Sequence, residues 1–72
     1  MQQYQLTLTA TKRPETLERI LRVTRHRGFE LVSLQAQQQE KVIELQMTVQ
    51  SQRAIELLVH QLIKLPDVIT LN

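Results

Sequence analysis

The stretch RHRGFELVSL, residues 25–34, joins three basic residues to the only glycine of the chain and then to an apolar run. Upstream of it, Leu17, Ile20 and Leu21 recur at the spacing of one helical face. Basic side chains suit the last helical turn, where they meet the negative end of the helix dipole. Glycine suits the left-handed residue that closes a helix. We therefore predict a helix that ends at Gly28 and a strand directly after it, with a basic binding patch as the alternative.

Hydrophobic periodicity predicts the other elements. Apolar and polar residues alternate, or β-branched residues gather, in three further segments that we predict to be strands: residues 4–12, 42–50 and 67–72. Pro14 suits the first position of the first helix, because its missing N–H costs nothing there. Ser51 suits the N-cap of a second helix, which has to end before Pro66.

The two halves of the chain resemble each other. A shift of 37 residues places Leu31 on Val68, Val32 on Ile69, Leu34 on Leu71, Ile20 on Leu57 and Leu21 on Leu58. Two β-α-β halves with short links predict an α+β fold, a ferredoxin-like βαββαβ sandwich. We expect four antiparallel strands with both helices on one face, forming a single domain over residues 1–72.

The second and fourth strands predict self-association. Strict alternation makes these strands apolar on both faces, with Val32, Leu34, Ile69 and Leu71 on one of them. An apolar edge of this kind is either curled into the core or covered by a second chain. A chain of 72 residues without cysteine has a small core and no disulfide to support it. We therefore expect a homodimer.

Composition excludes several classes of function. Nine Lys and Arg against seven Asp and Glu give a net charge of only +2. Tyr4 and Phe29 are the only aromatic residues. A nucleic-acid site on the arginines of the first helix is therefore a minor alternative. One glycine rules out a glycine-rich phosphate loop, and Ser33 and Ser51 have no neighbouring base. We expect no catalysis, no cofactor, no metal and no membrane span, and a cytoplasmic location.

The start of the first helix is a candidate effector site. Backbone N–H groups at a helix start favour a carboxylate ligand. Such a site would use Lys12, Arg13, Pro14 and Glu15, with Glu30 from the start of the second strand. The alternative is an ordinary solvated loop, since Pro14 removes a donor and Glu15 repels anions.

Four runs carry a family resemblance: PETLER (14–19), LRV (21–23), RHRGF (25–29) and LIKLPDV (62–68). Together they resemble ACT domains, and more closely the regulatory small subunits of acetolactate synthase of the isozyme II type. The resemblance implies a non-catalytic partner of a large catalytic subunit, which carries thiamine diphosphate, magnesium and FAD. That enzyme serves the synthesis of valine, leucine and isoleucine, and the small subunit raises its activity.

The same resemblance bears on the effector. Valine-sensitive relatives have an asparagine, a glycine and an asparagine where this chain has Lys12, Glu15 and Glu30, so we expect weak or no valine binding. Arg22 and Arg25 on the first helix are our predicted contacts with the large subunit, and the alternative is the polar sheet face formed by Gln5, Thr7, Thr9, Gln46 and Thr48. The alternative function is a free-standing ACT module that binds another amino acid or docks on an unrelated enzyme.

Overall fold

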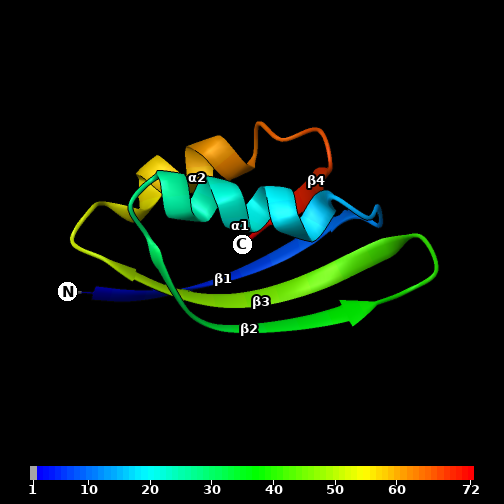
Figure 1. Cartoon of the computed structure of the whole chain (residues 1–72), viewed down its shortest axis with the longest axis horizontal. Helices are drawn as coiled ribbons and strands as arrows, with labels where there is room; N and C mark the ends of the chain where they lie inside the picture. The colour runs from blue at the N-terminus through cyan, green and yellow to red at the C-terminus, as the bar shows by residue number, and fades with distance from the viewer. Residues whose placement is uncertain (1) are drawn as a thin grey trace.

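The computed structural model describes residues 2–72, which form one sheet covered by two helices (Figure 1). The elements are β1 (Gln2–Thr11), α1 (Thr16–His26), β2 (Glu30–Gln38), β3 (Val42–Ser51), α2 (Ile55–Leu62) and β4 (Val68–Leu71). All neighbouring strands are antiparallel in the order β2-β3-β1-β4, which confirms the predicted ferredoxin-like sandwich. The strands β2 and β4 are therefore the two edges of the sheet.

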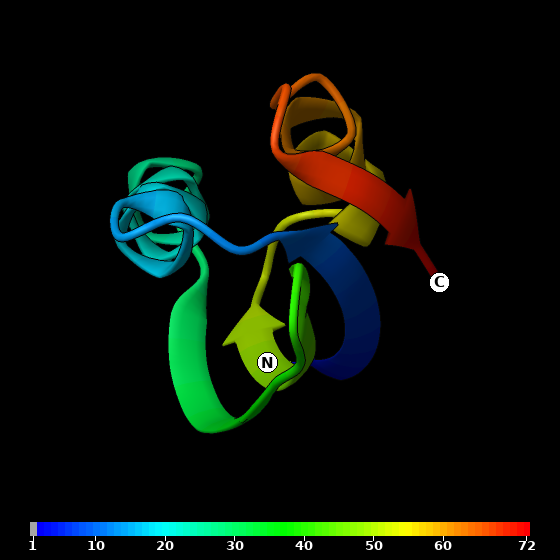
Figure 2. The ribbon, with the colours of Figure 1, turned by 90° about the vertical axis from the view of Figure 1, so that its right-hand side faces the viewer.

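The core lies between the helices and one face of the sheet. Viewed along the long axis, α1 and α2 lie side by side above the sheet, and the opposite face is left bare (Figure 2). The buried apolar side chains are Leu6, Leu8 and Ala10 of β1, Ile43, Leu45, Met47 and Val49 of β3, and Ile20, Phe29, Leu58 and Leu62. The alternation predicted for β1 and β3 is confirmed, because the residues between these strand positions point to the bare face.

The end of α1 follows the prediction closely. Gly28 has a φ of 83°, the left-handed value that side chains with a Cβ resist. Its N–H donates to the Arg25 carbonyl at 3.1 Å, and the N–H of Phe29 donates to the Thr24 carbonyl at 3.2 Å. This is the hydrogen-bond pattern of a Schellman cap. The basic cluster thus belongs to a helix end, and the buried ring of Phe29 fixes the start of β2.

Both helix starts differ from the prediction. Pro14 lies in a turn before α1, which begins at Thr16, whose N–H donates to the Arg13 carbonyl at 3.1 Å. Ser51 is not an N-cap but the last residue of β3. Its hydroxyl donates to the Gly28 carbonyl at 2.9 Å and accepts from the N–H of Arg53 at 3.0 Å. A hydroxyl that suits a cap is used here to tie the β3–α2 link to the end of α1.

Each edge strand contains a β-bulge, which corrects the predicted alternation. In β2 the pairing moves from Leu31 with Val49 to Ser33 with Thr48, so Val32 has no residue opposite it. Leu31 and Leu34 consequently share the face that carries the core, whereas strict alternation had placed them on opposite faces.

The bulge in β4 falls at the equivalent place in the repeat. The pairing moves from Thr9 with Thr70 to Ala10 with Val68, which leaves Ile69 unpaired. Val32 and Ile69 are 47% and 55% exposed. The strands thus keep the 37-residue relation, bulge included.

The helices keep a slightly different relation. Ile20 is fully buried, whereas Leu57, its partner in the sequence repeat, is 50% exposed. Leu58 takes the buried position instead. The position equivalent to Ile20 in α2 is therefore Leu58, one residue later than the 37-residue shift placed it.

Candidate effector loop and edge flanks

The predicted effector loop, residues 12–15, connects β1 to α1 and is exposed at all four positions. The start of the loop is fixed by backbone hydrogen bonds to two distant segments. The N–H of Thr11 donates to the Asp67 carbonyl at 2.8 Å, and the N–H of Lys12 donates to the Lys41 carbonyl at 3.0 Å. The loop therefore lies at the end of the sheet where the β2–β3 turn and the start of β4 meet.

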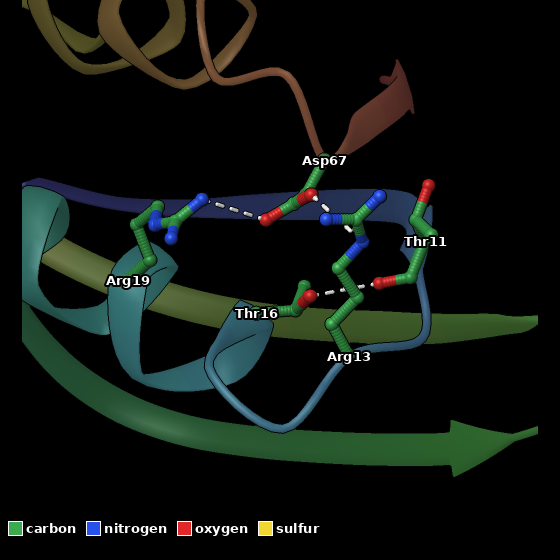
Figure 3. Close-up of polar contacts among 5 residues, drawn as sticks. All are labelled: Thr11, Arg13, Thr16, Arg19 and Asp67. Atoms are coloured by element: carbon green, nitrogen blue, oxygen red, sulfur yellow. Dashed lines mark hydrogen bonds and ion pairs between the residues drawn. The ribbon is translucent and has the colours of Figure 1, made fainter.

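A buried carboxylate organises this end of the molecule. Asp67 is only 5% exposed, and its two oxygens face Arg19 at 2.9 Å and Arg13 at 3.8 Å (Figure 3). Beside it, the hydroxyl of Thr16 donates to the Thr11 carbonyl at 2.8 Å. Burial of a carboxylate is costly unless cations and donors surround it, and here two arginines do so. Asp67 thus holds the loop, α1 and β4 together.

This arrangement leaves the loop poorly suited to an amino-acid carboxylate. The guanidinium of Arg13 faces Asp67. Pro14 has no N–H, and the N–H of Thr16 is used within the turn. Glu15 occupies the N-cap without a side-chain hydrogen bond to the helix, so its exposed negative charge lies where a ligand anion would bind. The solvated-loop alternative fits this geometry better than a preformed effector site.

Glu30 does not join the loop within one chain. It begins β2, next to the C-terminal end of α1, whereas the loop precedes the N-terminal end (Figure 1). An 11-residue helix is about 16 Å long, so the two parts of the predicted site are separated. The side-chain amide of Gln50, across the ladder, donates to the Glu30 carboxylate.

The α1–β2 flank is one lateral surface of the sandwich. We define it by Leu17, Leu21, Leu31, Val32 and Leu34, which are half-buried or exposed. Leu17 and Leu21 lie one position beyond the buried stripe of α1, on the side away from Arg19 and its partner Asp67.

Charged residues border the α1–β2 flank. A shallow depression along it is lined by Pro14, Leu17, Glu18, Leu21, Arg22 and Arg25. Arg22 pairs with Glu18 at 2.7 Å, and Arg25 is exposed near the C-terminal end of α1. The two predicted large-subunit contacts, Arg22 and Arg25, therefore lie together at the rim of this flank.

The α2–β4 flank is the opposite lateral surface. We define it by Ile55, Val59, Ile63, Ile69 and Leu71. The first three are spaced by four residues, so they form one stripe of α2 and its C-cap. The sequence-predicted self-association residues are thus divided between the flanks, with Val32 and Leu34 on one and Ile69 and Leu71 on the other.

Over residues 2–72, no helix is long and apolar enough to cross a membrane. In the same range, no three side chains of His, Asp or Glu gather at a point where they could hold a metal ion. The buried polar side chains Thr16, Thr24, Ser51 and Asp67 each have a hydrogen-bond partner within the chain. Their observed role is to hold the fold.

A comparison with known families agrees with this fold: residues 12–71 match the family model described as the ACT domain. The chain belongs to the ACT domain family. The matched range begins at the candidate loop and ends at β4, so it includes every residue of both flanks.

Relatives of this ACT domain define the resemblance further. The chain is 47% identical over 70 residues to the acetolactate synthase isozyme 2 small subunit of Escherichia coli K12, covering 94% of this chain and 80% of that protein. The Shigella flexneri protein of the same name matches equally.

Two solved structures agree with the fold. The ACT domain of the GTP pyrophosphokinase of Chlorobium tepidum superimposes with a TM-score of 0.84 at 10% identity, covering 97% of this chain and 94% of that one. The acetolactate synthase small subunit of Thermotoga maritima has a TM-score of 0.84 at 17% identity, and this ACT domain spans 47% of its length. At these identities the agreement concerns the fold alone.

Proposed function

We propose that this ACT domain is a regulatory, non-catalytic subunit that activates acetolactate synthase in the synthesis of valine, leucine and isoleucine. The observation that carries the proposal is the 47% identity, over 94% of the chain, to a protein named as a small subunit of that enzyme. The range matched by the family model includes both flanks, which are the surfaces that a partner chain would cover.

The chemistry belongs to the partner in this proposal. Thiamine diphosphate, magnesium and FAD would be bound by the large catalytic subunit in the cytoplasm, and this chain would bind none of them. Activation then requires that the ACT domain bind the active arrangement of the catalytic chains more tightly than the inactive one. Docking supplies the free energy for that shift.

Self-association through the α1–β2 flank fits the proposal. The β2 strand has nine residues and an unpaired edge, and an isologous contact would pair it with β2 of a second copy. Antiparallel pairing would also bring Glu30 of one copy toward the effector loop of the other, which completes the predicted set of residues only in the dimer. Val32 and Leu34 would be covered in this contact.

We further propose that valine is not an effector. Supporting this, the Arg13 guanidinium faces Asp67, and Glu15 and Glu30 place negative charges at both parts of the candidate site. The measurement is isothermal titration of the dimer with valine, which should show no saturable binding at micromolar concentrations. Saturable micromolar binding would contradict valine insensitivity and leave the subunit role intact.

The main test is reconstitution. The purified chain is mixed with the purified large subunit of acetolactate synthase from the same organism, loaded with its cofactors, and acetolactate formation is measured with and without it. We expect co-elution and a several-fold rise in rate. A chain that neither binds nor activates the large subunit would refute the function. If a free amino acid nevertheless raised its Tm, the result would favour a free-standing ACT module.

A further inference from the structure

The α2–β4 flank is an exposed aliphatic surface that the self-association proposed above leaves free. Ile63 and Ile69 are 54% and 55% exposed. Ile55, Val59 and Leu71 are half-buried, because one side of each packs on the core. The flank therefore packs on the core with one side and exposes its other side to solvent. Exposed apolar patches of this kind often bind proteins.

The direction of the flank follows from the contacts of α2. Leu58 and Leu62 form its buried stripe, and Gln61, on one side of that stripe, accepts a hydrogen bond from Arg27 at the end of α1. Ile55, Val59 and Ile63 lie on the other side of the stripe. They consequently face away from α1, on the side where β4 runs below α2 (Figure 2).

The chemistry of the flank points to a neutral protein surface. β4 carries no charged residue, and the apolar stripe of α2 has only Glu56 and Lys64 as charged neighbours in the chain. Nucleic acid and anionic lipid would require a group of lysines or arginines at the contact. Interface cores between proteins, in contrast, are depleted in charge and rich in apolar side chains.

A second copy of this chain has a better place to bind. The four residues of β4 offer a ladder about 13 Å long and the nine residues of β2 one of about 30 Å, and each strand contains one bulge. A stable contact needs about 800 Å² from each partner, roughly one sixth of the 4905 Å² surface of the chain. The long edge with α1 beside it meets that requirement more readily. Because an isologous dimer uses its surface once per chain, the α2–β4 flank stays open at both outer ends.

We propose that the α2–β4 flank, centred on Ile63 and Ile69, docks onto an uncharged aliphatic surface of the catalytic subunit. This inference rests on the proposed function. It assigns the two edges of one sheet to different partners, β2 to a second copy and β4 to the catalytic chain. One dimer of the ACT domain would then connect two catalytic chains, one at each end.

The internal repeat supplies a matched pair of variants for the test. Ile69→Asp places a charge on the α2–β4 flank at an unpaired bulge, so no ladder pair is removed. Val32→Asp makes the same change at the equivalent bulge of the other edge. Ile63→Asp, beyond the end of α2, is a second docking variant that does not touch β4. Circular dichroism selects the variants that are folded.

Each folded variant is measured for self-association by sedimentation and for affinity to the cofactor-loaded large subunit by titration calorimetry. We expect Ile69→Asp and Ile63→Asp to bind roughly tenfold or more weakly while remaining dimeric, as expected for charges placed in an apolar contact. We expect Val32→Asp to become monomeric and to keep its affinity per chain.

Two results would overturn the assignment of the flank: wild-type affinity in both docking variants, or loss of docking in Val32→Asp alone. Failure of the wild-type chain to bind the large subunit would instead refute the proposed function itself. The two failures are thus separated by the wild-type titration.

Discussion

The two flanks of this ACT domain are built on the same repeat but differ in strand length and in charge. The α1–β2 flank has a nine-residue strand and is bordered by Glu18, Arg22 and Arg25. The α2–β4 flank has a four-residue strand, and Glu56 and Lys64 are the charged residues next to its apolar stripe in the chain. The core and the bulges are common to both halves, so the surfaces are where the halves have diverged. Functions specific to one flank should therefore respond to different substitutions and conditions.

The largest effect on stability is expected from a change in the core that supports both flanks. Leu45 lies on β3, is fully buried, and contacts the common core. We expect Leu45→Ala to lower the free energy of unfolding by about 2–5 kcal/mol, which is comparable to the stability of a small domain. Urea denaturation measures the loss. A loss below about 1 kcal/mol would show that the flanks do not depend on one shared core.

A smaller effect is expected at Gly28, which supports the α1–β2 flank by ending α1 and positioning β2. A Cβ on this residue would lie 2.7 Å from Nε of Arg53, and the φ of 83° disfavours alanine. We expect Gly28→Ala to cost about 1–2 kcal/mol by urea denaturation. Gly28→Asn is the control, since asparagine tolerates the left-handed region and should cost less. An equal cost for both would argue that contact with Arg53, and not φ, dominates.

Asp67 is the corresponding support of the α2–β4 flank, because it precedes β4 and faces two arginines. Those arginine side chains are 42% and 61% exposed, which reduces the strength of both ion pairs. We expect Asp67→Ala to cost about 1 kcal/mol, with faster hydrogen exchange at the N–H of Thr11 and of Thr16. Arg13→Ala, which removes only the 3.8 Å pair, serves as control and should be close to neutral. Unchanged exchange in Asp67→Ala would show that the carboxylate does not hold the loop.

The smallest effect is expected from salt, and it distinguishes docking through the arginines at the rim of the α1–β2 flank from docking through the apolar centre of the α2–β4 flank. Docking through Ile63 and Ile69 should change little in affinity between about 0.05 and 0.5 M NaCl, since screening acts on charges. Docking through Arg22 and Arg25, the contacts predicted from the sequence, should weaken steadily over the same range. Titration of the large subunit at several salt concentrations makes the distinction. A steep loss of affinity with salt would favour the arginines.

Local signals in the sequence were sufficient for most of the fold. The end of α1 could be predicted because its cap hydrogen bonds, from Gly28 to Arg25 and from Phe29 to Thr24, join residues that are close in the chain. The core of β1 and β3 could be predicted because central strands alternate without interruption. Ser51 was misassigned for the opposite reason, since its partner, the Gly28 carbonyl, lies 23 residues away.

The parts that could not be predicted depend on registers and distances set by the whole sheet. A bulge at Val32 or Ile69 exists only relative to the strand it faces, so a two-residue period does not reveal it. Asp67 was missed because Arg19 lies 48 residues away in the chain. The sequence offered one sign that Asp67 is structurally important, because it is a single carboxylate between Pro66 and an apolar strand. Residues 12–15 do connect β1 to α1, as the sequence predicts, but the distance between this loop and Glu30 depends on the direction in which α1 runs.

The bulges at Val32 and Ile69 also affect how readily chains aggregate before they bind a partner. Uninterrupted apolar edges recruit further strands indefinitely and lead toward fibrils. Here each edge strand contains one bulge residue that has no partner on the neighbouring strand and that increases the local twist. The bulges thus let both apolar edge strands stay exposed before a partner binds, while they discourage the repeated addition of strands from other chains. Deleting the unpaired residue of either edge strand should therefore increase aggregation.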